Sequence, residues 1–250
     1  MTVQCSICGN SFTPRTNPFS EEIKTCPDCI RERMTRETEE EIKRASEYFE
    51  LERIKKMRIR EEFFYKTLES FIVHDETSLL AKKAAIDFLE GKIKKLILLG
   101  KNGIGKSHIA NAILKKHKGK SIRYTAYELF MKLRECYSFK AEFTEMQFLE
   151  SLLDYDCLLI EELGRTKGSD AELNFLSLLI DEYHTQGKQL IFTSNKIKMA
   201  ECEGYQNKKC KNCLDKKCFE KFFELDALSR LAQNSQIISL KGEDWRRKTE

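Results

Sequence analysis

The sequence contains little proline, histidine or tryptophan, and it lacks a long apolar run. Its 250 residues include three prolines, four histidines and one tryptophan. With 34% charged and 41% hydrophobic residues, this composition excludes a proline-rich disordered chain and favours a globular, helix-rich one. No apolar run reaches the roughly 20 residues of a membrane span, and the first residues do not resemble a signal peptide. We therefore expect a cytoplasmic protein with no membrane partner.

The charge balance is too mild to identify a partner by itself. A net charge of +4 permits a nucleic-acid partner, but such binding depends on clustered rather than total charge. The length gives room for one good-sized core and a small additional piece. Partner and activity must therefore be sought in motifs.

Ten cysteines are the first such signal. Disulfides are not expected in a reducing cytoplasm, and the four histidines lie far from the cysteine groups, so a local metal site would be all-thiolate. Two C-x2-C knuckles, Cys5 with Cys8 and Cys26 with Cys29, are separated by 17 residues, a spacing typical of a four-cysteine zinc site. Four thiolates complete the tetrahedron, so this zinc would be structural.

A second group consists of Cys202, Cys210, Cys213 and Cys218, in a lysine-rich stretch. Its C-x7-C-x2-C-x4-C spacing contains only one C-x2-C knuckle, so it predicts a second zinc site less specifically. The alternative is a set of surface thiols. Exposed unligated cysteines are open to oxidation, which favours zinc.

The pattern of residues divides the chain into three parts. Residues 1–30 would form the zinc-binding domain. Residues 31–66, without proline or glycine and dense in Glu, Lys and Arg, predict a charged linker that is one long helix or a helical hairpin. Residues 67–250 alternate short apolar runs with amphipathic helices, which predicts an α/β core with a parallel sheet between helices.

The stretch "GKNGIGKS" satisfies the P-loop pattern, after a predicted strand and at the start of a predicted helix. Its glycines let the backbone N–H groups face phosphate, and the helix N-terminus adds positive potential. Lys106 would reach the β- and γ-phosphates of ATP, and Ser107 would ligate Mg²⁺. The expected nucleotide-binding residues are Gly100, Lys101, Asn102, Gly103, Ile104, Gly105, Lys106, Ser107 and His108.

Four more residues are candidates for catalysis. Glu161 and Glu162 follow an apolar strand; the first would support Mg²⁺ and the second would polarise the attacking water. Asn195 ends another strand, where it would sense the γ-phosphate. Arg230, on a short helix before the last strand, is either an arginine finger for a neighbouring subunit or a surface arginine in an ordinary ion pair.

These motifs occur in an order that resembles one family. "KKLILLGKNGIGKSHIANAIL", "LLIEELG", "IFTSN" and "LSRLAQNSQIISLKGEDWR" are together similar to the DnaC and IstB group of AAA+ ATPases, over about residues 69–246. The resemblance implies a lidless AAA+ core, and it assigns nucleotide, Mg²⁺, sensor and finger roles to the residues named above. It also implies self-association through the finger.

Two features distinguish this chain within the group. The family commonly has aspartates where this chain has Glu161 and Glu162, so hydrolysis is expected to be slow, and stimulated by DNA or by oligomerisation. A cysteine-rich N-terminus is similar to DnaI-type loaders, which implies an ATP-dependent loader of a hexameric replicative helicase onto single-stranded DNA. The alternatives are an IstB-like transposition helper and a non-hydrolysing zinc-containing adaptor. The segment at about 201–222 looks like an insertion.

A DNA contact is predicted in the stretch "FMKLRECYSFK". Its basic residues Lys132, Arg134 and Lys140 suit phosphate pairing, and Tyr137 and Phe139 suit base stacking. Aromatic side chains on a helix more often face a core. Both interpretations are carried forward.

Overall fold

The computed structural model describes residues 2–13, 25–165, 168–198, 218–219, 223 and 225–244. The chain forms two compact units, Met1–Arg53 and Ile54–Glu250. Helix α1 (Pro27–Lys56) crosses the division. Within the described residues, no helix has the length and apolar character needed to cross a membrane.

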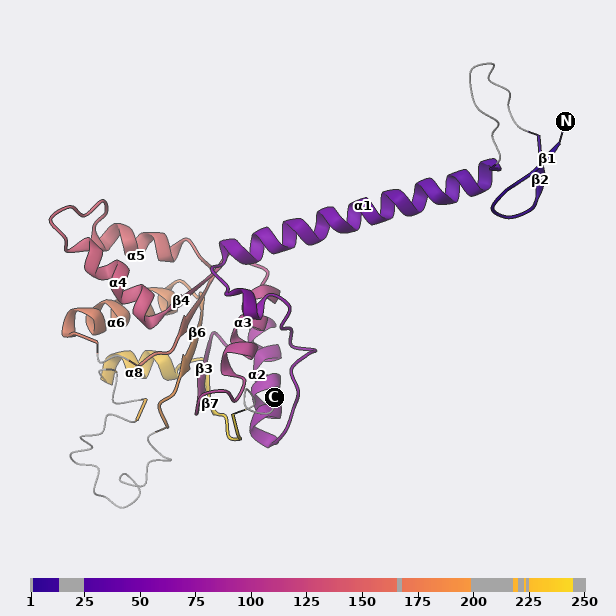
Figure 1. The fold of residues 1–250 in the computed structure, drawn as a ribbon. Coiled ribbons are helices and arrows are strands. Elements are labelled where there is room, and N and C mark those ends of the chain that lie inside the picture. Colours follow the sequence, from indigo (N-terminus) through magenta and orange to yellow (C-terminus); the bar gives the residue numbers. More distant parts are fainter. Residues whose placement is uncertain are drawn as a thin grey trace. The chain divides into compact units, whose positions relative to one another are not determined.

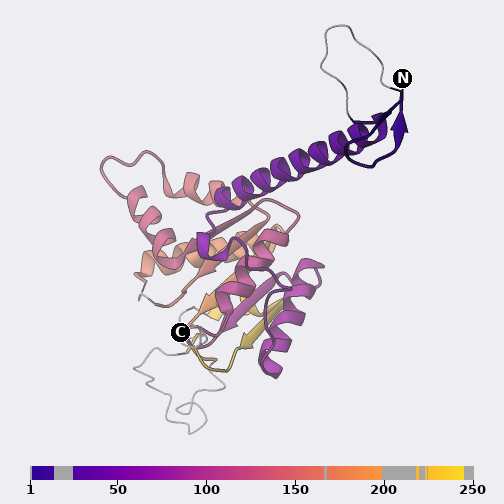
Figure 2. The same cartoon turned by 45° about the vertical axis from the view of Figure 1, so that its right-hand side comes forward.

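The first unit is a small hairpin followed by most of α1. Strands β1 (Val3–Gln4) and β2 (Ser11–Phe12) pair antiparallel. Proline is well suited to the first position of α1, because it has no N–H to leave unpaired there. Residues 31–56 of the predicted linker lie in one helix, which ends at Lys56, rather than in a helical hairpin (Figure 2). Its surface carries i,i+4 ion pairs such as Arg44–Glu40, at 3.2 Å.

The second unit is built on a five-stranded parallel sheet in the order β4-β5-β6-β3-β7. The strands are β3 (Lys95–Leu99), β4 (Ser121–Thr125), β5 (Cys157–Glu161), β6 (Gln189–Ser194) and β7 (Ser235–Ser239). The predicted fold class is confirmed. Helices cover both faces of the sheet, so the side chains on both faces of each strand are buried. This is why the strands appear in the sequence as nearly continuous apolar runs.

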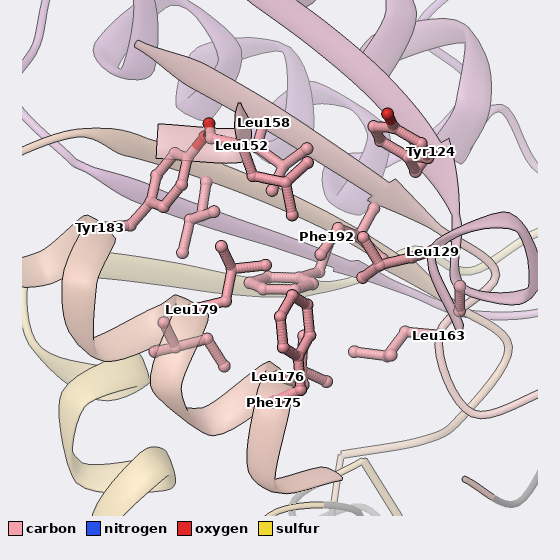
Figure 3. Packing of buried hydrophobic residues seen from close by; sticks show 14 of the residues in the cluster. Tyr124, Leu129, Leu152, Leu158, Leu163, Phe175, Leu176, Leu179, Tyr183 and Phe192 are labelled. Carbon is pink, nitrogen blue, oxygen red and sulfur yellow. Dashed lines mark hydrogen bonds between the residues drawn. The ribbon is translucent and has the colours of Figure 1, made fainter. Parts of the chain in front are cut away.

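Helices cover the sheet on both sides (Figure 1). One face is covered by α2 (Glu76–Leu89) and α3 (Lys106–Lys116). The other is covered by α4 (Ala126–Cys136), α5 (Glu145–Leu153), α6 (Asp170–Thr185) and α8 (Leu225–Ala232). Figure 3 shows the second core, where Phe175 and Leu179 lie among residues of the sheet such as Leu158 and Phe192. The two cores pack on opposite faces of the sheet and hold the strands in place. The candidate site lies at the carboxyl ends of these strands.

The sequence analysis missed α5. This helix begins after Thr144, whose hydroxyl accepts a hydrogen bond from the Gln147 N–H, while the Gln147 side-chain oxygen accepts one from the Thr144 N–H. Threonine with glutamine three residues later is a capping box, a recognisable start signal. Phe148, Leu149 and Leu152 then face the core. The capping box is present in the sequence, but the helix has only nine residues, so its apolar periodicity is weak.

The end of α1 and the segment after it are part of the second unit. Ile54, Met57 and Ile59 are buried in the core beneath α2 and α3. The ammonium of Lys115 donates to the carbonyls of Phe63 and Phe64, both at 2.7 Å, in and beside the short 3-10 helix η1 (Glu61–Phe63). This segment therefore forms one wall beside the P-loop helix.

Candidate functional site

The loop after β3 has the backbone conformation that its glycines allow. Gly100, Gly103 and Gly105 have φ values of 133°, 77° and 95°, a region that side-chain-bearing residues rarely adopt. A Cβ at Gly100 would also lie 2.5 Å from the Leu240 carbonyl oxygen. The loop leads directly into α3, so the N–H groups of the first turn of that helix face the same place.

Lys106 is held at the centre of this loop. Its side chain is largely buried, and its ammonium donates to the carbonyl oxygens of Gly100, at 2.7 Å, and Lys101, at 2.5 Å. A lysine anchored to the loop carbonyls is pre-positioned to pair with a phosphate, so little conformational entropy is lost on binding.

Most of the predicted residues meet at one cavity of about 320 Å³. The P-loop supplies Asn102, Gly103, Gly105, Lys106, Ser107 and His108; the strand ends supply Glu161, Glu162, Thr193 and Asn195; the preceding segment supplies Arg60, Glu62, Phe63 and Lys66. Gly100 and Lys101 line an adjoining pocket of about 240 Å³ that also contacts Asn195. Ile104 is buried in the core. The sequence analysis missed the wall formed by residues 60–66.

Sheet order explains why the polar strand ends converge. Strand β6 lies between β3 and β5, so Asn195 follows the strand between the P-loop and the two glutamates. The carboxyl ends of parallel strands lie at one sheet edge, which is where ligands bind in open α/β sheets. Asn195 itself is exposed at this edge.

Glu161 is buried and bound on both sides. It ends β5, and its Oε2 forms an ion pair with the Nε of Arg123 on the neighbouring strand β4. Its Oε1 accepts from the Asn111 side-chain amide at 3.2 Å. The sequence analysis missed both partners. An arginine inside the apolar run "SIRYT" was the available signal, because a buried guanidinium needs a counter-charge.

Glu162 has a strained backbone. Its φ of 59° lies in the left-handed region, which is costly for a residue with a side chain and which often marks functional sites. The N–H of Glu162 donates to Thr193 Oγ1 at 3.2 Å, and its Oε2 accepts from Arg165 Nη1 at 2.7 Å. The turn directs this half-buried carboxylate to the cavity rim.

His108 fastens the preceding segment to α3. Its Nε2 lies 2.8 Å from the Thr67 carbonyl oxygen, and its ring packs edge-on against Phe71 with centroids 5.3 Å apart. Burial lowers the pKa of His108, because it disfavours the charged ring. The residue has a structural role beside its place in the cavity wall.

Arg230 lies far from its own chain's cavity. Its Nε is 2.8 Å from Asp181 Oδ1 on α6, and α8 ends three residues before β7 begins. The P-loop follows the opposite, carboxyl end of the sheet, and a strand of five residues spans roughly 15 Å. The ordinary ion pair is thus present, and a finger role requires a second molecule.

The residues at the cavity fit Mg²⁺. The side chains of Ser107, Glu161 and Glu162 line the cavity and offer oxygen atoms as possible metal ligands. Oxygen is the ligand type that Mg²⁺ prefers. Asn111 Oδ1, next to Glu161, is buried and has no hydrogen-bond partner within the described part of the chain. An unsatisfied acceptor at that place suits a metal-bound water, since Mg²⁺ usually retains several waters.

The N-terminal cysteines form a metal-binding geometry in the first unit. The sulfurs of Cys5, Cys8, Cys26 and Cys29 all lie within 4.8 Å of one another. The Cys8 and Cys26 sulfurs are 3.7 Å apart, close to the about 3.8 Å expected between two thiolates on a tetrahedral zinc ion. The chemistry and spacing of the four sulfurs therefore fit zinc.

Backbone hydrogen bonds prepare one of these thiols for metal. The Sγ of Cys5 accepts from the N–H groups of Cys26, at 3.3 Å, and Ile7, at 3.4 Å. These bonds, that from Cys26 foremost, lower the pKa of Cys5 to about 6, because donors to sulfur stabilise its charged form. The thiolate is the form that binds metal.

The second cysteine group falls mostly outside the described residues. The described residues do not include Cys202, Cys210 or Cys213, nor most of the predicted insertion at 201–222. Cys218 is buried and forms a parallel bridge with Ile197, and the Phe219 N–H donates to the Ile197 carbonyl at 2.8 Å. The second zinc site stays a prediction.

The predicted DNA-binding residues lie on α4 and the loop after it. Phe139 is fully exposed, and Lys140 is exposed as well. Arg134 is 2.9 Å from Glu172, and Lys132 lies over the Phe143 ring at 5.6 Å.

Tyr137 is exposed on the same loop. Its hydroxyl donates to Glu145 at 2.6 Å, and this hydrogen bond raises the pKa of Tyr137 to about 12. The core-facing alternative therefore does not apply to Tyr137 or Phe139, since both rings are exposed. Whether the loop binds DNA stays a prediction.

The chain is similar in sequence to known ATP-binding and replication proteins. The family model for IstB-like ATP-binding proteins matches residues 28–250. The replicative helicase loader DnaC of Buchnera aphidicola subsp. Schizaphis graminum is 31% identical over 145 residues, which cover 55% of this chain and 58% of the relative. The chromosomal replication initiator DnaA of Helicobacter hepaticus is 29% identical over 138 residues, or 53% of this chain and 29% of the relative. The chain thus spans little more than half of the length of the first and less of the second.

Solved structures show the same fold. The crystal structure of the DnaC helicase loader has a TM-score of 0.57 and 18% identity, covering 73% of this chain and all of that one. The crystal structure of DnaI has a TM-score of 0.54 and 21% identity, covering 74% and 96%. At these identities the likeness concerns the fold.

Proposed function

Because the chain belongs to the family of IstB-like ATP-binding proteins, we propose that it is a helicase loader that binds and hydrolyses ATP. In this proposal the protein oligomerises, grips single-stranded DNA and places a hexameric replicative helicase on it, and hydrolysis resets the complex. The observation that carries the proposal is the convergence of Lys106, Ser107, Glu161 and Glu162 on one cavity.

Each residue has one task in the proposed reaction. The P-loop N–H groups and Lys106 bind the phosphates. Ser107 and, through a water, Glu161 would hold Mg²⁺, which would supply charge stabilisation. Glu162 orients and polarises the attacking water, and Asn195 contacts the γ-phosphate. Arg60, Glu62, Phe63 and Lys66 line the same cavity.

A loader is favoured over a transposition helper by the N-terminal cysteine knuckle and by the similarity to DnaC. We expect immobilised full-length chain with ATP to retain a purified hexameric replicative helicase and not a transposase. An unrelated hexameric ATPase is the control for binding to rings in general. Retention of the transposase alone would establish the helper instead, and retention of neither would favour the adaptor.

The proposed DNA contact uses the loop after α4. Phe139 offers an exposed ring for base stacking, and Lys140 offers charge for phosphate. Arg134 already has a carboxylate partner in Glu172, so its contribution to DNA affinity would be smaller. The loop therefore centres on Phe139.

Self-association is proposed through Arg230. We expect Arg230→Ala to bind ATP within about twofold of wild type and to lose about 10³-fold in turnover, as for other arginine fingers. Mixing it with Lys106→Ala, which retains Arg230 but has a defective P-loop, should restore part of the turnover, because the intact P-loop of one chain is then completed by Arg230 of the other.

A variant of the ion-pair partner provides the control. Asp181→Ala removes the carboxylate that Arg230 contacts and keeps the arginine, so turnover should stay within a few-fold of wild type. Equal losses in both variants, without restoration on mixing, would mean that Arg230 only fastens α8 to α6.

A further inference from the structure

Arg123 carries a charge into the interior of the second unit. It is the middle residue of β4, and only 1% of its surface is exposed. A buried guanidinium is costly unless it is paired and hydrogen-bonded, so its partners indicate why it is there.

The partners connect Arg123 to the nucleotide cavity. In the sheet, Arg123 lies opposite Leu159, and Glu161 is two residues further along the same strand. Alternate residues face the same side of a sheet, so Glu161 is the diagonal neighbour of Arg123. Nε of Arg123 pairs with Glu161 Oε2, and Nη1 lies 3.4 Å from both Glu128 Oε2 and the Arg58 carbonyl oxygen.

This arrangement fixes the position of Glu161. One carboxylate oxygen is held by Arg123 and the other by Asn111, at 3.2 Å. The two donors come from β4 and α3, two separate elements. Glu161 therefore cannot rotate towards a cation without losing a buried ion pair, although each oxygen retains a lone pair for a metal-bound water.

We propose that Arg123 is a positioning residue for the nucleotide site: it holds Glu161 in its orientation and is the counter-ion that Mg²⁺ must compete with. The inference rests on the proposed ATP binding at this cavity. It explains how two adjacent carboxylates coexist, since Glu161 and Glu162 are each paired with an arginine. The proposal also accounts for glutamate rather than aspartate at position 161, because the longer side chain reaches Arg123.

The proposal predicts effects of opposite sign on metal affinity and turnover. In Arg123→Gln, the Mg²⁺ concentration for half-maximal turnover should fall about tenfold, because removal of a unit charge beside a divalent cation has that effect even at water-like screening. Turnover at saturating Mg²⁺ should fall about tenfold, because Glu161 is no longer oriented. ATP affinity in EDTA should stay within about twofold.

Two further variants are measured with it. Arg123→Gln combined with Glu161→Gln removes both charges, and its half-saturating Mg²⁺ concentration should not fall below that of wild type. Arg123→Lys keeps the charge and loses the planar Nε donor; its half-saturating Mg²⁺ concentration should match wild type while turnover still falls. Arg123→Lys decides the question of positioning if Arg123→Gln does not fold, and wild-type turnover in it would overturn that role.

Other outcomes separate this inference from the proposed function. An unchanged or higher Mg²⁺ requirement in Arg123→Gln, together with weaker ATP binding in EDTA, would mean a merely structural arginine and would overturn the proposal. If the wild type binds ATP without hydrolysing it, the proposed loader reaction fails. The Mg²⁺ titration is then read from the affinity of a fluorescent ATP analogue, with the same tenfold shift expected in Arg123→Gln.

Discussion

Glu162→Gln is expected to bind ATP within about twofold of wild type and to lose about 10³-fold in turnover, the range typical for removal of a general base. Glutamine fills the same space but cannot accept a proton, and the left-handed turn at Glu162 stays in place. Lys106→Ala should fail earlier, with ATP affinity reduced by about 100-fold, because a buried charge-assisted contact to phosphate is lost.

Turnover and equilibrium binding are both needed to interpret this pair. ATP hydrolysis is measured with and without single-stranded DNA, and binding is measured by calorimetry. Glu150→Gln is the matched control, since Glu150 is exposed on α5 and does not line the cavity.

Stimulation of ATP hydrolysis by single-stranded DNA should be reduced in Phe139→Ala, because the exposed ring proposed to stack on bases is removed. If wild type and Glu162→Gln both bind ATP and neither hydrolyses it, the non-hydrolysing adaptor is the better description.

The P-loop and the polar residues that follow the strands were predictable because they depend on local sequence. The pattern around Gly100 to Ser107 needs only a strand before it and a helix after it. The five strands were found because each is a short apolar run bounded by turns, and this is typical of a parallel sheet covered on both faces.

Pairing between distant residues was not predictable in the same way. The contact between Arg123 and Glu161 depends on the register of β4 against β5, which no local pattern specifies. From the sequence, Glu161 was expected to support Mg²⁺ and Glu162 to polarise the attacking water. The structure provides arginines for both, Arg123 and Arg165, so the glutamate pair alone does not require a metal.

The N-terminal cysteines lead to the second large effect, on the folding of the first unit. Its hairpin has two residues in each strand, and Cys5 and Cys26 are the buried apolar residues described there before α1. So small a piece has no core of its own, whereas structural zinc contributes on the order of 10 kcal/mol to folding. Removal of zinc should therefore unfold residues 2–13 and 25–30.

We expect the purified chain to contain one zinc at Cys5, Cys8, Cys26 and Cys29, and a second if the group around Cys210 also binds metal. Cys8→Ser with Cys29→Ser should reduce the zinc content by one per chain, and Cys210→Ser with Cys213→Ser should remove the other. Cys136→Ser is the control, because this thiol lies on α4, outside both groups. Metal content is measured by mass spectrometry.

Hydrogen exchange distinguishes a structural metal from an incidental one. A strong chelator should abolish amide protection at Cys26 and Ile7, whose N–H groups donate to the Cys5 sulfur, because the bonds are lost when the four sulfurs separate. Protection in β3 to β7 and ATP affinity should be unchanged, since the P-loop lies in the other compact unit. A chain that is purified under reducing conditions without zinc, and whose N-terminal amides are equally protected with and without chelator, would contradict a zinc-dependent fold. The four thiols would then be held by packing alone.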